Sequence, residues 1–401
     1  MNDDTPRSSR LVPLIILLLA SMPSAVPAKE VCGPGPGPGA TLLIPYFEVD
    51  LDDPSGRTTL ISVSNADSQP VVARVTLWTN MAVPSLVFDM VLEADAVRTL
   101  NLRSILEGDL PQTAGDQTFS RCIDPVAEDV PASLVPALQA MHTGEPPFAD
   151  GQCFGLPADE PGLAVGYITV DAMNDCNPVF TYPGDTDEYF GHRYFEHGGG
   201  GLASNRNVLW GDAFYLDPGG DAAMGIAALA LRADADRLGP FDRTFYSGVG
   251  CCGDDSREPL PSTYRVRFFD GGAFDGESDV ILWLDPSVSS VGFGDGFDCE
   301  NPEHLVSFCQ YLTLRVFDEN GELHSEQTIN SSQPLSRRLR VGGGELPVPV
   351  DFGFIEVRNE VLEACILIPT GFIPLQASAI TVLRAAGRFS AAFESVALDS
   401  L

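Results

Sequence analysis

Positive charge is what this 401-residue sequence has least of. Lysine and arginine together number 23 against 56 aspartates and glutamates, the formal net charge is −33, and Lys29 is the only lysine. A surface of this sign repels phosphate backbones, so the composition argues against nucleic acid as a partner and favours divalent cations or basic surfaces. GC-rich coding bias is the first explanation for the arginine preference, and adaptation to salt is the second.

Long apolar runs are missing beyond the N-terminus. Leu11–Ala20 is shorter than the roughly 20 residues that a membrane-spanning helix needs. Val26, Pro27 and Ala28 fit the small-residue rule of signal-peptide cleavage, so residues 1–28 are expected to be a removed signal peptide. An uncleaved membrane anchor is the alternative. The mature chain is therefore expected to be soluble, without a membrane span, and exported, either to a periplasm or out of the cell.

Catalytic motifs are missing too, because the sequence contains no nucleophile elbow, P-loop, dinucleotide fingerprint or kinase motif set. Among only five histidines, His192 and His197 form the only close pair. Their spacing differs from the i, i+4 pair of a zinc-protease helix, and the glycines after His197 exclude a helix there. A polar loop is the first interpretation, and a loop-borne metal site of a hydrolase, with Glu196 beside the histidines, is the second.

Nine cysteines in an exported chain indicate disulfides, and the CxxC spacing of zinc sites is missing. We predict the disulfides Cys299–Cys309 and Cys122–Cys153, because each pair brackets one short segment. The cysteine at 176 is expected to bond to one of the adjacent cysteines at 251 and 252. Five cysteines have no fixed pairing from the sequence alone: Cys32, Cys176, Cys251, Cys252 and Cys365.

Short alternating strands are what the sequence has in abundance. From Val71 to Trp78 apolar residues alternate between two faces, and further strands are predicted at Thr58–Ser64, Leu86–Leu92 and Val97–Leu102. This spacing is typical of an antiparallel sandwich, in which each strand buries one face and exposes the other to water.

The second half of the sequence repeats the first in outline. In both halves an aromatic strand passes through an acidic turn into a second strand, and a hairpin and a Gly-aromatic strand follow. We therefore expect a mainly β fold of two tandem antiparallel β-sandwich (Ig-like) units with the same strand order. Superposition should align Tyr46 with Phe268 or Phe269, and Tyr167 with Phe354. One larger sandwich with interleaved strands is the alternative.

The expected domain boundaries follow from composition and the repeat. Residues 128–144 carry a helix signature, with Asp129 as the N-cap and Gly144 at the C-terminal end, so a short helical insertion is expected in the first unit. The expected segments are a signal peptide (1–28), a Gly/Pro spacer (29–40), a first sandwich (41–236, insertion 107–160), a linker (237–262) and a second sandwich (263–401).

Acidic turns are the strongest candidates for a cation. Asp270, Asp275, Glu277 and Asp279 lie in one turn, and calcium takes six to eight oxygen ligands from flexible loops. The spacing does not match an EF-hand, and Asp and Gly are ordinary turn residues, so a metal-free acidic turn is the alternative. No other cofactor is expected.

Four stretches carry a resemblance that runs in order over most of the mature chain. They are TTLISVSN…ARVTLWTN, NVLWGDAFYLDP, REPLPSTYRVRFFDGGAFD and GRFSAAF. In these stretches the chain resembles exported bacterial β-sandwich proteins to which no function is assigned. The resemblance implies the sandwich fold and export, and it carries no catalytic residues.

Together these features predict an exported acidic β-sandwich protein that acts as a non-enzymatic structural or interaction module. Its partner is expected to be another protein or a cell-surface polymer. A secreted hydrolase with a loop-borne acidic or histidine site is the alternative. The three tryptophans fall within strand patterns, where core or half-buried packing is the first interpretation and a carbohydrate-stacking platform the second: Trp78, Trp210 and Trp283.

Overall fold

The computed structural model consists mainly of antiparallel β-strands, which confirms the predicted β-sandwich class. Residues from Cys32 to Leu401 form one compact unit. No helix in the described part of the chain is long and apolar enough to cross a membrane. The predicted signal peptide and most of the spacer lie outside the described residues. These are 37–124, 126–145, 152–177, 180–181, 194–195, 197–219, 222–233, 257–258, 260, 263–272, 276–284, 297–298, 310–330, 336–361, 377–385, 389–394 and 396–397.

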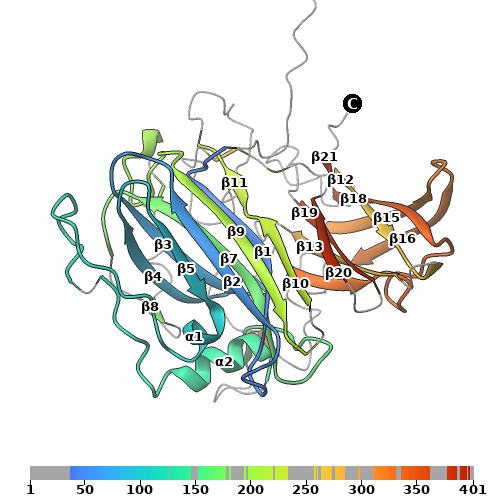
Figure 1. Cartoon of the computed structure of the whole chain (residues 1–401), viewed down its shortest axis with the longest axis horizontal. Helices are drawn as coiled ribbons and strands as arrows, with labels where there is room; N and C mark the ends of the chain where they lie inside the picture. Colours follow the sequence, from blue (N-terminus) through green and yellow to red (C-terminus); the bar gives the residue numbers. More distant parts are fainter. Residues whose placement is uncertain are drawn as a thin grey trace, which may run out of the picture. The chain divides into compact units, whose positions relative to one another are not determined.

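The first sandwich pairs a six-stranded sheet, in the order β11-β1-β7-β3-β4-β8, with a four-stranded sheet, in the order β10-β9-β2-β5 (Figure 1). The strands of the larger sheet are β1 (Thr41–Asp50), β3 (Val71–Thr79), β4 (Pro84–Leu92), β7 (Leu163–Met173), β8 (Phe180–Thr181) and β11 (Leu229–Leu231). The strands of the smaller sheet are β2 (Thr58–Asn65), β5 (Val97–Asn101), β9 (Leu209–Asp217) and β10 (Ala222–Ala227).

The second sandwich pairs a five-stranded sheet, in the order β16-β15-β18-β12-β21, with a four-stranded sheet, in the order β17-β13-β19-β20. The strands of the larger sheet are β12 (Thr263–Phe269), β15 (Gln310–Asp318), β16 (Leu323–Asn330), β18 (Phe352–Val361) and β21 (Val396–Ala397). The strands of the smaller sheet are β13 (Gly276–Leu284), β17 (Ser336–Arg340), β19 (Ala377–Ala385) and β20 (Phe389–Glu394). The predicted hairpin of the second half joins β15 to β16 through a turn that contains Asn320 and Gly321, and Gly321 has a positive φ of 82°.

The two sandwiches have the same strand order. Reading each half from its first strand, β1-β2-β3-β4-β5-β7-β9-β10-β11 correspond to β12-β13-β15-β16-β17-β18-β19-β20-β21. The sheet β11-β1-β7-β3-β4 then becomes β21-β12-β18-β15-β16, and β10-β9-β2-β5 becomes β20-β19-β13-β17. The predicted tandem repeat is therefore confirmed at the level of topology.

Side-chain hydrogen bonds fix the register of the repeat. Thr59 Oγ1 bonds both backbone groups of Glu48, at 3.1 and 3.0 Å, and Ser278 Oγ bonds both backbone groups of Phe269, at 3.0 and 2.6 Å. Glu48 therefore corresponds to Phe269, and the residue before it, Phe47, corresponds to Phe268. The predicted alignment of Tyr46 with either phenylalanine is wrong, because a bulge between Ile44 and Phe47 adds a residue to β1.

The second predicted alignment is confirmed. Phe47 pairs with Gly166, and Phe268 pairs with Gly353. The residues after these glycines, Tyr167 and Phe354, are therefore equivalent. Each stacks on the aromatic residue opposite: Trp78–Tyr167 centroids are 5.6 Å apart, and Phe317–Phe354 centroids are 4.8 Å apart.

Two helices follow β5 in the first sandwich: α1 (Leu102–Leu106), which the sequence did not predict, and α2 (Val135–Thr143). The predicted N-cap of the second, Asp129, is wrong, because α2 begins later, with Leu134 as its N-cap. The Asp129 carboxylate instead accepts a hydrogen bond from the backbone N–H of Leu110. The C-terminal signal is confirmed, since Gly144 caps α2 in the left-handed conformation.

The expectation that each strand exposes one face holds for β2 and β9 but is wrong for β1, β3, β4 and β7. Nearly every residue of these four strands is buried. One face packs on the smaller sheet. On the other face Leu43, Trp78 and Tyr167 join a cluster that includes Trp283 of the second sandwich. Alternation fails here because the larger sheet is covered on both sides.

The predicted linker, 237–262, is anchored rather than free where the structure describes it. Arg257 is fully buried, and it donates to Thr41 Oγ1 at 2.9 Å and to the Ser204 carbonyl at 2.9 Å. Asp171 lies 4.0 Å from the same guanidinium. The short strands β6 (Gln152–Cys153) and β14 (Phe297–Asp298) also pair between the two halves.

The predicted disulfide between Cys122 and Cys153 is wrong. Cys122 bonds to Cys176, with α-carbons 5.0 Å apart, which also corrects the expected partner of Cys176. Asp175 holds the two segments together, because its carboxylate accepts hydrogen bonds from Ser120 Oγ and from the backbone N–H of Arg121. Cys153 lies in β6 and is itself disulfide-bonded. The predicted pair Cys299–Cys309 lies outside the described residues.

Candidate functional site

A cleft of about 610 Å³ opens where the second sandwich meets the first. Its walls come from β1, from the loop at 156–160, from β13 and β17, and from Glu345. The second sandwich contributes the outer face of its smaller sheet, whose Trp283 contacts Tyr167 edge-on at 5.9 Å. Ser336 Oγ also donates to the Pro45 carbonyl at 2.6 Å. The cleft therefore borders a direct sheet-to-sheet contact.

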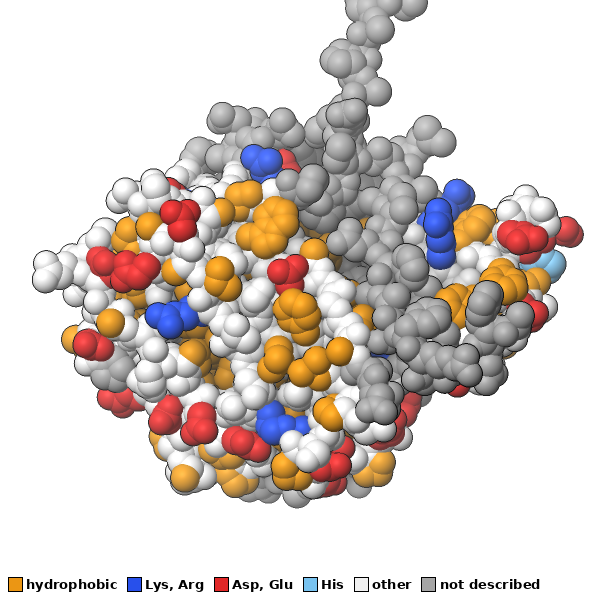
Figure 2. Space-filling view, viewed as in Figure 1, with side chains coloured by type: hydrophobic (Ala, Val, Ile, Leu, Met, Phe, Trp, Pro, Cys, Tyr) orange, Lys and Arg blue, Asp and Glu red, His pale blue; other side chains and the backbone are white. Residues whose placement is uncertain are grey.

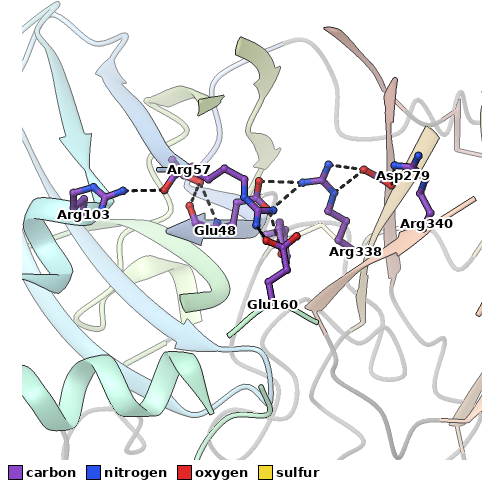
Figure 3. Close-up of polar contacts among 9 residues, drawn as sticks. Glu48, Arg57, Arg103, Glu160, Asp279, Arg338 and Arg340 are labelled. Carbon is purple, nitrogen blue, oxygen red and sulfur yellow. Dashed lines mark hydrogen bonds and ion pairs between the residues drawn. The ribbon is translucent and has the colours of Figure 1, made fainter. Parts of the chain in front are cut away.

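Charged side chains form a ladder across this contact (Figure 3). Arg338 of β17 lies with its Nη1 3.0 Å from both carboxylate oxygens of Glu48 in β1. Its Nε donates to Asp279 of β13 at 2.9 Å. Arg57 approaches Glu48 at 3.8 Å and forms an ion pair with Glu160. Alternating charges from distant parts of the sequence therefore meet in one row.

The ladder sets the protonation of its members. Burial alone would lower the pKa of Arg338, but the carboxylates of Glu48 and Asp279 outweigh it, so the pKa lies above the ordinary arginine value. Burial, followed by the charge of Glu48, raises the pKa of Tyr46 well above its ordinary value. The row is thus a set of fixed ion pairs, which suits holding surfaces together better than moving protons.

Arg337 is the one side chain lining the cleft that carries a buried atom lacking a hydrogen-bond partner among the described residues. Its Nε is enclosed without an acceptor. Burial lowers the pKa of Arg337 to about 10, and Glu345 opposes that shift. Arg337 alternates with Arg338 along β17, and it is Arg338 that contacts Glu48 and Asp279 in the ladder.

The predicted calcium ligands are only partly described. Asp275 lies outside the described residues. Glu277 contacts Arg340 at 2.5 Å, and Asp279 is nearly buried between Arg338 and Arg340. The structure therefore places arginines against two of the four carboxylates, a pairing that the turn sequence alone did not indicate.

A second group of possible metal ligands lies in the β15–β16 turn, where Asp318, Glu322 and His324 approach one another. Asp318 is already occupied, because its carboxylate accepts the backbone N–H groups of Asn320 and Glu322 at 2.9 and 2.8 Å. These bonds close the turn.

The histidine pair predicted as a loop-borne metal site cannot be located in the described part of the chain. His192 lies outside the described residues, and the side chain of His197 is not described.

Ser85 and His142 form a pair that sequence analysis missed. Ser85 Oγ lies 2.6 Å from His142 Nε2, and Nδ1 of the same ring lies 3.0 Å from the Val165 carbonyl. The carbonyl accepts only from an N–H, so Nδ1 carries the proton and Nε2 accepts from the serine. Both side chains are 1% exposed, and the Phe47 ring lies 5.3 Å from the imidazole. The geometry resembles a nucleophile and its base, but the pair is sealed in the core.

Exposed apolar side chains gather on two outer sheet faces. We call the outer face of β10-β9-β2-β5 face A; it exposes Val97, Trp210 and Phe214 by 60%, 40% and 40%. Figure 2 shows hydrophobic side chains over this part of the first sandwich. Trp78 and Trp283 are therefore packed in the core as predicted, while Trp210 is only partly buried on an outer sheet face.

We call the outer face of β16-β15-β18-β12 face B. Phe352 and Leu323 are exposed there by 44% and 48%, next to the stacked rings of Phe317 and Phe354. The Arg265 guanidinium lies 4.9 Å from the centre of the Phe354 ring. Face B is thus an aromatic surface beside basic side chains, on a chain that is strongly acidic as a whole.

No protein-family model matches the chain, and no curated protein matches it. Among solved structures, the chain is similar to a glycosyl hydrolase family 2 member from Bacteroides cellulosilyticus DSM 14838, at 10% identity and a TM-score of 0.14. The similarity covers 90% of this chain and 28% of that chain. A likeness of this size carries no argument about fold or activity.

Proposed function

We propose that this protein is an exported, non-catalytic interaction module that binds another protein or a cell-surface polymer through faces A and B. The carrying observation is that five of the six large hydrophobic side chains exposed in the described part of the chain lie on these two faces. The sixth, Ile123, lies beside the Cys122–Cys176 disulfide. Apolar side chains concentrated in this way on flat sheet faces are typical of interaction surfaces. Export rests on the N-terminal sequence and the family resemblance.

Replacing Trp210 and Phe214 together with threonine is expected to remove binding while leaving the fold intact. Surface side chains contribute little to folding, so the free energy of unfolding should change by about 0.5 kcal/mol or less per site. Binding is measured by sedimentation velocity for the protein itself and by co-sedimentation with purified peptidoglycan and cellulose. Wild type should associate in at least one assay, and the double variant in none. Equal behaviour of the two proteins, or an inert wild type, would contradict the proposal.

The rival function, a secreted hydrolase, would use the histidine pair at 192 and 197 with acidic loops. The described chemistry favours binding instead, because the cleft carboxylates Glu48 and Asp279 are held in ion pairs.

A calcium ion at the Asp270–Asp279 turn is a further proposal, which rests on the acidic turn sequence and requires calcium to compete with Arg340 for Glu277. Binding to the folded state should raise stability by about 2.7 kcal/mol at a hundredfold excess of calcium over Kd. Melting curves in calcium, magnesium and sodium chloride of matched ionic strength test this, with Asp275→Ala as the variant. We expect a saturable, calcium-specific gain that Asp275→Ala abolishes. Equal gains in all three salts would mean that only screening is at work.

A further inference from the structure

We propose that face A of one copy docks on face B of a second copy, so that the contact between the two repeats within the chain is repeated between chains. The inference rests on the proposed function and names its partner. A contact that joins two different faces leaves both outer faces free for further copies, so the product is an open head-to-tail series rather than a closed dimer.

The repeat supplies the geometry. Within the chain, the outer face of β17-β13-β19 docks on the outer face of β1-β7-β3, through Trp283 against Tyr167 and Arg338 against Glu48. By strand order, the equivalent of the docking face is face A, on β5-β2-β9. The equivalent of the receiving face is face B, on β12-β18-β15. Each sandwich thus has one docking face and one receiving face. Within the chain, face A of the first sandwich and face B of the second remain free of this contact.

The register places large side chains at the equivalent positions. Trp283 pairs across the docking sheet with Ser336 on one side and Ser378 on the other. In the first sandwich its equivalent, Ser64, pairs with Val97 and Trp210. In the docking sheet the large residue, Trp283, lies between two serines, whereas on face A the serine, Ser64, lies between two large residues. Face A therefore also presents apolar side chains at the cross-strand position that corresponds to Trp283. On the receiving side, the Trp78–Tyr167 stack is replaced by the stack of Phe317 and Phe354.

Charge supports the same pairing. The ladder within the chain sets an arginine of one sheet against a carboxylate of the other. On face B, Arg265 and Arg358 pair with Glu356 and Arg315 pairs with Glu326, and the three arginine side chains remain 46%, 38% and 31% exposed. Face A carries Asp212 among uncharged outward residues of β2, β5 and β9. These three arginines outnumber the two carboxylates that they contact, and this local excess of positive charge offers a position for Asp212 of face A.

The test is the mass of the full mature chain by sedimentation equilibrium over a wide concentration range. Wild type should grow in mass with concentration and pass beyond a dimer. Trp210→Thr with Phe214→Thr removes face A, and Leu323→Thr with Phe352→Thr removes face B. Each variant alone should stay monomeric, with Kd raised at least about tenfold. Ile123→Thr, the exposed hydrophobic off both faces, is the matched control and should assemble like wild type.

Mixing the two variants decides the arrangement. Each still carries one intact face, so the mixture should form a dimer of one copy of each and grow no further. Self-assembly of either variant alone would mean that like faces meet, and would overturn the proposal. A wild type that stays monomeric throughout would overturn it as well, independently of how the variants fold. If that monomer still binds peptidoglycan or cellulose through Trp210 and Phe214, faces A and B remain interaction surfaces and only the second copy is excluded.

Discussion

Replacing Asp89 with asparagine is expected to destabilise the protein by about 3–5 kcal/mol, because it removes the carboxylate that pairs with the buried Arg74 guanidinium. Arg74 of β3 donates two hydrogen bonds to this carboxylate, at 2.7 and 2.9 Å, and both side chains are 1% exposed. The carboxylate also accepts the backbone N–H of Asn177 at 2.6 Å. Urea unfolding at neutral pH measures the loss.

The exposed pair Arg315–Glu326 supplies the matched control, because it joins the corresponding hairpin of the second sandwich at 2.7 Å. Glu326→Gln should change stability by at most about 1 kcal/mol. Replacing Arg74 and Asp89 together by methionine and leucine removes both charges, and should restore most of what Asp89→Asn loses. A loss below about 1 kcal/mol for Asp89→Asn would show that the buried arginine is satisfied without it.

His142 is expected to make stability fall as the solution is acidified. Burial lowers its pKa from 6.5 to about 4, against the opposing hydrogen bond to the Val165 carbonyl. The folded state therefore holds the neutral ring, while the unfolded chain takes up a proton as pH drops through 6.5. Stability from this residue is complete above pH 6.5 and is lost between pH 6.5 and about 4, by up to about 3 kcal/mol.

Comparison with His142→Gln isolates this effect from the many carboxylates that also titrate. Between pH 7 and pH 4.5 the wild type should lose about 2–3 kcal/mol more than the variant. Comparing two pH values within each protein cancels any general loss from the substitution. His324→Gln removes a histidine from the exposed turn and should keep the wild-type difference. Parallel pH profiles for wild type and His142→Gln would show that the buried ring is protonated in the folded state.

The fold was largely predictable because strand signals are local. The alternation at Val71–Trp78, the Asn-Gly turn and the Gly-aromatic strands each lie within about ten residues of sequence, and together they yield the repeat. The covered second face of the six-stranded sheet was not predictable. The residues that cover Trp78 and Arg74 come from distant parts of the chain, so the sequence around these two residues does not predict their burial.

The candidate surfaces were harder to predict for the same reason. Trp210 alternates like any strand residue, and only the tertiary structure shows that its side of β9 faces water. The partners Ser85 and His142 are separated by 57 residues, and Arg338 and Glu48 by 290. Cys122 likewise forms its disulfide with Cys176 rather than with the expected Cys153, because strand β7 brings the chain back beside Cys122. Contacts between residues so far apart in the sequence produce no spacing pattern from which they could be predicted.

The anchoring of Arg257 has a consequence for how the chain folds as it is made. The first sandwich ends at β11, yet Thr41 and Asp171 receive their guanidinium only from a residue beyond it. Glu48 receives Arg338 later still. A nascent chain that has emerged as far as residue 231 therefore holds all the strands of its first sandwich, but Asp171 has not yet met Arg257, Glu48 has not yet met Arg338, and the Trp78–Tyr167 stack lacks its contact with Trp283. The first sandwich therefore gains these ion pairs and ring contacts only after the residues beyond 231 have been synthesised and have folded against it.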